Sequence, residues 1–113
     1  MQVISRKALV EACSENKYRT AANEVDAWEK VASKAEWGSL EDVQRTYSDA
    51  DSVRIGNRIY TVFNIGRNQF RLVVQINHQF KMIFFKRLMT HAEYDREEWK
   101  KSLKKEQERQ GVL

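Results

Sequence analysis

Hydrophobic residues in the first half of the chain recur at the three- and four-residue spacing of amphipathic helices. Three short helices are predicted, with Ser5, Thr20 and Ser39 as their expected caps. Asp42 follows Ser39 at the spacing of a capping box. The apolar stripes are Leu9, Ala12 and Cys13, then Ala21, Val25, Trp28, Ala32 and Ala35, and finally Leu40, Val43 and Tyr47. Before these helices, Met1–Ile4 is expected to form an edge strand.

In the second half the hydrophobic spacing changes to the alternation of β-strands. Strands are predicted at Arg58–Ile65, Phe70–Asn77 and Lys81–Met89, joined by short turns. The last of these is nearly continuous in apolar residues, which is typical of a strand covered on both faces. With Met1–Ile4, these segments predict an α+β fold, a small antiparallel sheet of three to four strands packed by the N-terminal helices.

A further helix is predicted at the end of the chain. Thr90 and Glu93 have the spacing of a capping box, so the helix should begin there. Its acidic residues come before its lysines, an order that suits the helix dipole. We expect this helix to continue through residues 96–113 as a C-terminal helix, and its end to fray because apolar residues are sparse after Trp99.

Length and composition bound the class of protein. The 113 residues support a single domain, 1–113. Cys13 is the only cysteine, which excludes an internal disulfide and a cysteine-based zinc site. Apolar runs fall short of the roughly 20 residues of a membrane span, and the first residues lack a secretory apolar region. A cytoplasmic protein with no membrane partner is therefore expected.

Charge is distributed unevenly along the chain. The net charge is only +4, but the segment Ser52–Ala92 contains no acidic residue. Such a one-signed segment suits a polyanionic partner, a nucleic acid or an acidic protein. The alternative is a sheet whose solvated edge carries cations against aggregation. The basic residues of this segment are Arg54, Arg58, Arg67, Arg71, Lys81, Lys86 and Arg87.

Candidate chemistry gathers where the last strand meets the last helix. His91 and Tyr94 are three residues apart at the expected helix start, so they should share one face. A helix N-terminus also favours a phosphate group. Arg71 and Lys86 lie on the two preceding strands, and antiparallel pairing would allow both cations to lie on one face near this junction.

One imidazole, one phenol and two cations suit RNA cleavage through attack by the 2′-hydroxyl. Histidine can donate or accept the proton near neutral pH, and arginine and lysine can stabilise the phosphorane charge. The reaction needs no metal, and the sequence predicts no metal site and no cofactor. Taken singly, Arg71 and Lys86 fit solvated strand positions, and Thr90 and Glu93 are explained by capping.

Two stretches of the chain resemble a known family. FNIGRNQFRL at 63–72 is similar to the F-N-x-G-x-N-x-x-R-L/V segment of the HigB family of toxins. MTHAEYD at 89–95 resembles that family's T-H-x-E-Y-D signature, and ADSV at 50–53 is also similar. These stretches lie in the middle-to-late third of the chain, in the expected order. Arg67 stands where many relatives have glycine, which leaves its role open.

The resemblance implies a RelE-like fold and a ribosome-dependent mRNA endonuclease, encoded beside a helix-turn-helix antitoxin. It implies that Arg71 and Lys86 contact the scissile phosphate, and that His91 and Tyr94 transfer protons or position the substrate, with base and acid unassigned. The partners would be mRNA on the ribosome and a HigA-like antitoxin, with operator DNA bound only through the antitoxin. Contacts to RNA or the ribosome are expected from Arg54, Arg58, Arg67, Lys81 and Arg87. The basic stretch Lys100–Arg109 fits either ribosomal RNA contact or a solvated helix.

Two other functions compete with the endonuclease. One is a non-catalytic RNA-binding module, which would need aromatic side chains on the basic face for stacking. Phe70 and Phe84 instead fit the core-facing alternation. The other is a toxin of the ParE branch, which shares the fold and acts on a protein such as gyrase. Such a toxin has no need of the His91–Tyr94 pair, so that pair favours the endonuclease.

Overall fold

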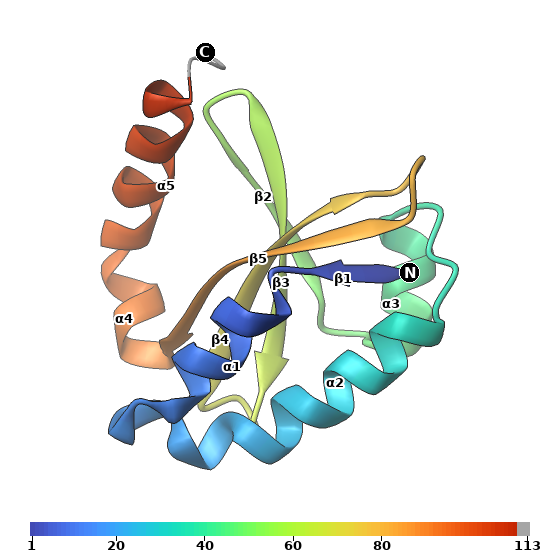
Figure 1. Cartoon of the computed structure of the whole chain (residues 1–113). Coiled ribbons are helices and arrows are strands. Elements are labelled where there is room, and N and C mark those ends of the chain that lie inside the picture. Colours follow the sequence, from blue (N-terminus) through green and yellow to red (C-terminus); the bar gives the residue numbers. More distant parts are fainter. Residues whose placement is uncertain (111–113) are drawn as a thin grey trace.

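A five-stranded mixed sheet lies at the centre of the computed structural model, which describes residues 1–110 (Figure 1). The strand order is β1-β5-β4-β3-β2; β1 pairs parallel with β5, and all the other pairs are antiparallel. The predicted α+β class is confirmed, but the sheet is larger than predicted and not wholly antiparallel. The strands are β1 Gln2–Ile4, β2 Asp51–Ile55, β3 Arg58–Ile65, β4 Phe70–Asn77 and β5 Met82–Thr90.

The strand that the sequence analysis missed is β2. It begins with two exposed polar residues, Asp51 and Ser52, and pairs only with β3, so its hydrophobic alternation is weak. A signal was nevertheless present in the two residues that separate β2 from β3. Gly56 has a φ of 59° and is followed by Asn57, which is typical of a tight hairpin turn.

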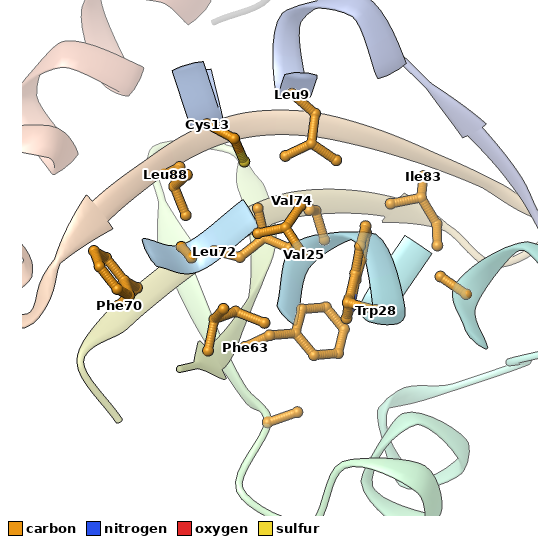
Figure 2. Packing of buried hydrophobic residues seen from close by; sticks show 14 of the residues in the cluster. Leu9, Cys13, Val25, Trp28, Phe63, Phe70, Leu72, Val74, Ile83 and Leu88 are labelled. Atoms are coloured by element: carbon orange, nitrogen blue, oxygen red, sulfur yellow. The ribbon is translucent and has the colours of Figure 1, made fainter. Parts of the chain in front are cut away.

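Three helices and a 3₁₀ segment pack their apolar side chains against one face of the sheet. Trp28 of α2 meets Phe63 of β3 edge to face, with ring centres 5.4 Å apart, and Leu72 and Val74 of β4 join the same core (Figure 2). Val73, between them, belongs to a second core on the opposite face. The β4 strand is therefore covered on both sides. The segments are α1 Arg6–Ser14, η1 Asn16–Ala21, α2 Ala22–Lys34 and α3 Leu40–Thr46.

Two of the three predicted helix caps differ from expectation. Ser5 precedes α1 with a φ of 69°, and its side chain makes no capping hydrogen bond in this left-handed conformation. Thr20 lies inside η1, and Ala21 precedes α2, because the chain enters that helix from another helical segment rather than from extended backbone. Ser39 caps α3 as predicted, its hydroxyl accepting from the Asp42 N–H.

The second face of the sheet is covered by the C-terminal segment, as two helices instead of the predicted one. α4 His91–Arg96 and α5 Glu98–Arg109 are separated by Glu97, whose φ of 62° ends the first helix. The expected fraying is not seen up to Arg109, because Leu103 and Gln107 are buried against the sheet. Residues 111–113 of the predicted helix lie outside the described part. No helix in residues 1–110 is both long and apolar enough to cross a membrane.

Candidate functional site

Arg71 is a buried cation at the end of the sheet where α4 begins. Its exposed fraction is 8%, and Nη1 donates to the carbonyls of Asn68 and Phe70, each at 3.2 Å. Within residues 1–110, no carboxylate lies within 4 Å of the guanidinium, so no ion pair neutralises it. Because buried charges are normally paired, this arginine is suited to bind an anionic ligand.

The turn before β4 places Arg71 and connects it to α4. Gly66, Arg67 and Asn68 all have positive φ values, and the turn delivers the Asn68 carbonyl to the guanidinium. The Gln69 carbonyl accepts from the His91 N–H at 2.9 Å. The turn that precedes Arg71 is therefore fixed to the first residue of α4.

Tyr94 lies directly beside this guanidinium. The Arg71 Cζ is 5.4 Å from the centre of the Tyr94 ring, within cation–π range. The ring stacks on Trp99, with centres 5.1 Å apart, and the Trp99 Nε1–H donates to the Tyr94 carbonyl. Burial is the main cause that raises the pKa of the Tyr94 phenol above 10, with Asp51 contributing in the same direction. The hydroxyl therefore stays protonated at neutral pH and can donate a proton.

His91 is the first residue of α4 and is exposed to solvent. Its Nδ1 lies 3.0 Å from Oδ2 of Asp95, one helical turn later. This contact favours a proton on Nδ1, which leaves Nε2 as the free ring nitrogen. No role was predicted for Asp95 from the sequence, although its four-residue spacing from His91 indicates a contact on one helix face.

Glu93 holds the start of α4 in place. The predicted capping box is present, with the Thr90 hydroxyl accepting from the Glu93 N–H and Glu93 Oε1 accepting from the Thr90 N–H. Glu93 also accepts from the Tyr18 hydroxyl at 2.6 Å and from Lys17 at 3.0 Å. Burial opposes ionisation of this carboxyl, but the hydrogen bonds from Thr90, Tyr18 and Lys17 outweigh it and hold its pKa at about 2. Glu93 therefore connects α4 to η1.

Arg71 and Lys86 lie on the same face of the sheet, as expected, but Lys86 lies further from the junction of β5 with α4. Arg71 is opposite Met89 in the β4–β5 register, and Lys86 lies three residues further along β5, beyond Arg87. A register shift at Val73/Val74 lies opposite Arg87 and Lys86. At about 3.4 Å per residue, the backbone positions of the two residues are offset by about 10 Å along the strands. Strand pairing was predicted, but its register was not.

The Lys86 side chain is 15% exposed, and its Nζ is 3.7 Å from Glu106 of α5. It lines a separate open pocket of about 640 Å³ together with Arg58 and Phe84. Phe84 is half-buried and belongs to neither hydrophobic core, so the expectation that it packs inward is wrong. The register shift near Lys86 brings this part of β5 under the end of α5.

The remaining basic residues predicted to contact RNA are spread over the molecule. Arg54 is exposed on β2, and Arg67 is exposed in the turn before β4. Lys81 donates to the carbonyl of Glu36 at 3.3 Å. Arg87 donates to the Ser102 hydroxyl at 2.9 Å, and Arg58 lines the pocket described above. Contacts of these residues with RNA stay predictions. Within residues 1–110, no three His, Cys, Asp or Glu side chains are grouped closely enough to hold a metal ion.

Comparison with known proteins identifies relatives over most of the chain. A family profile described as "HigB_toxin, RelE-like toxic component of a toxin-antitoxin system" matches residues 21–97. An mRNA interferase HigB of Escherichia coli O6:H1 strain CFT073 is 30% identical over 96 residues, 85% of this chain and 90% of the relative. An mRNA interferase toxin HigB of Escherichia coli K12 and an mRNA interferase HigB of Shigella flexneri are each 28% identical over 95 residues, 84% of this chain and 88% of the relative. The profile match includes Arg71, His91 and Tyr94 and ends where α4 meets α5.

Proposed function

The chain belongs to the HigB toxin family of RelE-like toxic components of toxin–antitoxin systems, and we propose on this basis that it is an endoribonuclease acting on mRNA bound to the ribosome. The printed names of its relatives describe mRNA interferases. The observation that carries the proposal is the buried Arg71 with no carboxylate partner in the described part of the chain. RNA supplies the missing anion as its scissile phosphate, which the guanidinium fork fits.

The cleavage that fits this geometry proceeds by attack of the neighbouring 2′-hydroxyl. We assign His91 Nε2 as the base that takes the 2′-hydroxyl proton while the 2′-oxygen bonds to phosphorus. Arg71 stabilises the phosphorane oxygens. The P–O5′ bond then breaks, and the Tyr94 hydroxyl protonates the leaving 5′-oxygen of the downstream fragment. A 2′,3′-cyclic phosphate remains at the 3′ end of the upstream fragment. These steps use no metal ion.

Three features support these roles. The raised pKa of Tyr94 keeps the phenol in its proton-donating form. Asp95 fixes the tautomer of His91 that leaves Nε2 free, so we assign Asp95 as a positioning residue. The hydrogen bond from the His91 N–H to the Gln69 carbonyl fixes the start of α4 against the turn that carries Arg71.

Lys86 has a different place in this proposal than the resemblance implied. It lies on β5 away from Arg71, so we assign it to RNA binding beside the reacting phosphate rather than to contact with that phosphate. For the protein partner, family membership implies an antitoxin. We propose a HigA-like helix-turn-helix antitoxin that links the toxin to operator DNA, and a cytoplasmic site of action.

Expression under a tightly controlled promoter, followed by mapping of mRNA 5′ ends, tests the proposed function. Wild-type protein should arrest growth and produce new 5′ ends in phase with codons. Arg71→Met and His91→Ala should abolish both, whereas Lys7→Gln should retain both, since Lys7 is an exposed residue of α1 outside the site. Growth arrest with intact mRNA and broken DNA would instead indicate a toxin that acts on gyrase. RNA binding without new 5′ ends would indicate a non-catalytic module.

A further inference from the structure

A second basic pocket lies on the same face of the sheet, outside the Arg71 site. It has a volume of about 640 Å³, within the range of about 300–1,000 Å³ common for small-molecule sites. Strands β3, β4 and β5 and the residue after α5 form its walls. Its lining includes Arg58, Gln75, Asn77, His78, Phe84 and Lys86, and none of the lining residues within residues 1–110 is acidic.

The charges around this pocket leave it positive. Glu106 is the one carboxylate within 4 Å of Lys86 in the described chain, at 3.7 Å, and it is shared with Arg87 at 3.9 Å. Its buried Oε2, the atom that faces Lys86, has no hydrogen-bond donor, and both distances are longer than a hydrogen bond, so neither contact is a well-formed ion pair. Arg58 is the second cation that lines the pocket, and it has no carboxylate within 4 Å in the same part of the chain. Among the described residues, the two lining cations stand against this one carboxylate, which leaves an excess of one positive charge that an anionic ligand would balance.

The uncharged lining suits a nucleobase. Phe84 is half-buried and lines this positively charged pocket, where a nucleobase can stack on its ring. His78 Nδ1 lies 2.9 Å from the Trp37 carbonyl, which can only accept, so in the neutral imidazole the proton lies on Nδ1 and Nε2 is an acceptor. Asn77 Oδ1 accepts from the Phe80 N–H at 3.0 Å, which leaves the Asn77 amide nitrogen as a donor. The pocket thus offers both a donor and an acceptor with fixed roles.

We propose that this pocket binds one nucleotide of a single-stranded RNA, with the phosphate on Arg58 and Lys86 and the base on Phe84. The identity of the ligand as RNA rests on the proposed function. An acidic peptide would use the two cations but would leave the aromatic ring and the fixed donor and acceptor unused, so the observations favour a nucleotide. Because Lys86 lies apart from Arg71, the pocket holds a nucleotide other than the one that is cut, and it would select the base at that position.

Nuclear magnetic resonance titrations of the full chain test this proposal. They are run in an Arg71→Met background, which removes the proposed catalytic cation, so the result does not depend on cleavage. We expect 5′-AMP to shift the amide signals of Gln75, Asn77 and Phe84 in a saturable way. Adenosine and inorganic phosphate alone should bind at least tenfold more weakly, because each makes only half of the contacts.

Variants locate the two halves of the site. Phe84→Leu keeps an apolar side chain and should weaken 5′-AMP about tenfold or more through lost stacking. Lys86→Gln should weaken 5′-AMP about fivefold or more at low salt, whereas Lys7→Gln removes an equal charge elsewhere and should change nothing. Amide spectra of each variant check that it is folded.

Three results would overturn the proposal. These are an absence of shifts at the pocket amides, equal affinity for phosphate and 5′-AMP, or tighter binding of an oligoglutamate peptide than of 5′-AMP. If 5′-AMP binds as expected while wild-type protein leaves mRNA uncut, the pocket stands and the proposed endonuclease activity fails. If wild-type protein cuts mRNA but 5′-AMP does not bind in the pocket, the endonuclease activity stands and the pocket proposal fails.

Discussion

At the scale of single residues, the decisive feature is the placement of Arg71. The sequence places it on the side of β4 away from Leu72 and Val74, and a solvated strand charge was the ordinary interpretation. The structure buries it under Tyr94 with only carbonyl partners for Nη1. That environment could not be predicted from sequence, because it depends on α4 closing over the end of the strand.

Replacing Arg71 with methionine should separate function from stability. A buried, unpaired charge is costly, and an apolar side chain of similar volume often leaves stability unchanged or higher. We expect Arg71→Met to lower cleavage at least about 100-fold, with urea unfolding showing no loss of stability. A large loss of stability, on the order of 3 kcal/mol, would show that Arg71 is a structural residue.

Tyr94→Phe tests the role of a single hydroxyl. The variant keeps the stacking on Trp99 and the cation–π contact with Arg71. We therefore expect thermal unfolding close to wild type and a fall in the single-turnover cleavage rate of about 100-fold or more, the contribution usual for a general acid. Unchanged cleavage would exclude the phenol as the proton donor. Trp99→Phe, which retains a stacking partner, serves as a comparison with the hydroxyl in place.

Glu93 makes stability depend on pH. Its folded-state pKa of about 2 lies below the ordinary value of 4.5, so its contribution is fully present above about pH 4.5 and is lost as the pH falls towards 2. We expect Glu93→Gln to lower the free energy of unfolding at pH 7, and to lose less further stability than wild type between pH 4.5 and 2. Denaturant unfolding across this range measures the effect, with Glu11→Gln as a control on exposed surface of α1. Parallel curves for wild type and Glu93→Gln would contradict this assignment.

At the scale of elements, the predictable features were those encoded over a few residues. The alternation in β3, β4 and β5 and the capping box at Thr90 were readable because local chemistry determines them. β2 was missed because its outer residues are polar and its only neighbour is β3. The break at Glu97 was missed because glutamate rarely adopts a positive φ, and packing of Trp99 against the sheet requires the chain to turn there.

The backbone conformation of Glu97, between α4 and α5, can be tested by substitutions that differ in their preferred φ at this position. Glu97 has a φ of 62°, which glycine adopts without strain and a β-branched residue strongly resists. We expect Glu97→Gly to raise stability by about 1 kcal/mol and Glu97→Val to lower it by a similar amount or more. Differential scanning calorimetry of the two variants provides the comparison. If both shift the unfolding temperature in the same direction, backbone strain at Glu97 is not what determines it.

At the scale of the whole molecule, the acid-free segment forms most of the sheet. It begins within β2 and ends in the first turn of α4, so all of β3, β4 and β5 lie inside it. Its cations are nevertheless divided: Arg71 lies in one site, Arg58 and Lys86 lie in a separate pocket, and the others are spread over the molecule. Sequence could identify the positive segment and the family, but not this division.

A reconstituted reaction tests the central claim, that Arg71, His91 and Tyr94 form a site that cuts RNA through its 2′-hydroxyl. Purified protein is added to ribosomes programmed with a short mRNA, which carries either ribose or 2′-deoxyribose on the 5′ side of the cut site. The proposed mechanism predicts that wild-type protein cuts only the ribose substrate and leaves a 2′,3′-cyclic phosphate, and that Arg71→Met cuts neither. Cleavage of the deoxy substrate, or undiminished cleavage by Arg71→Met, would contradict it.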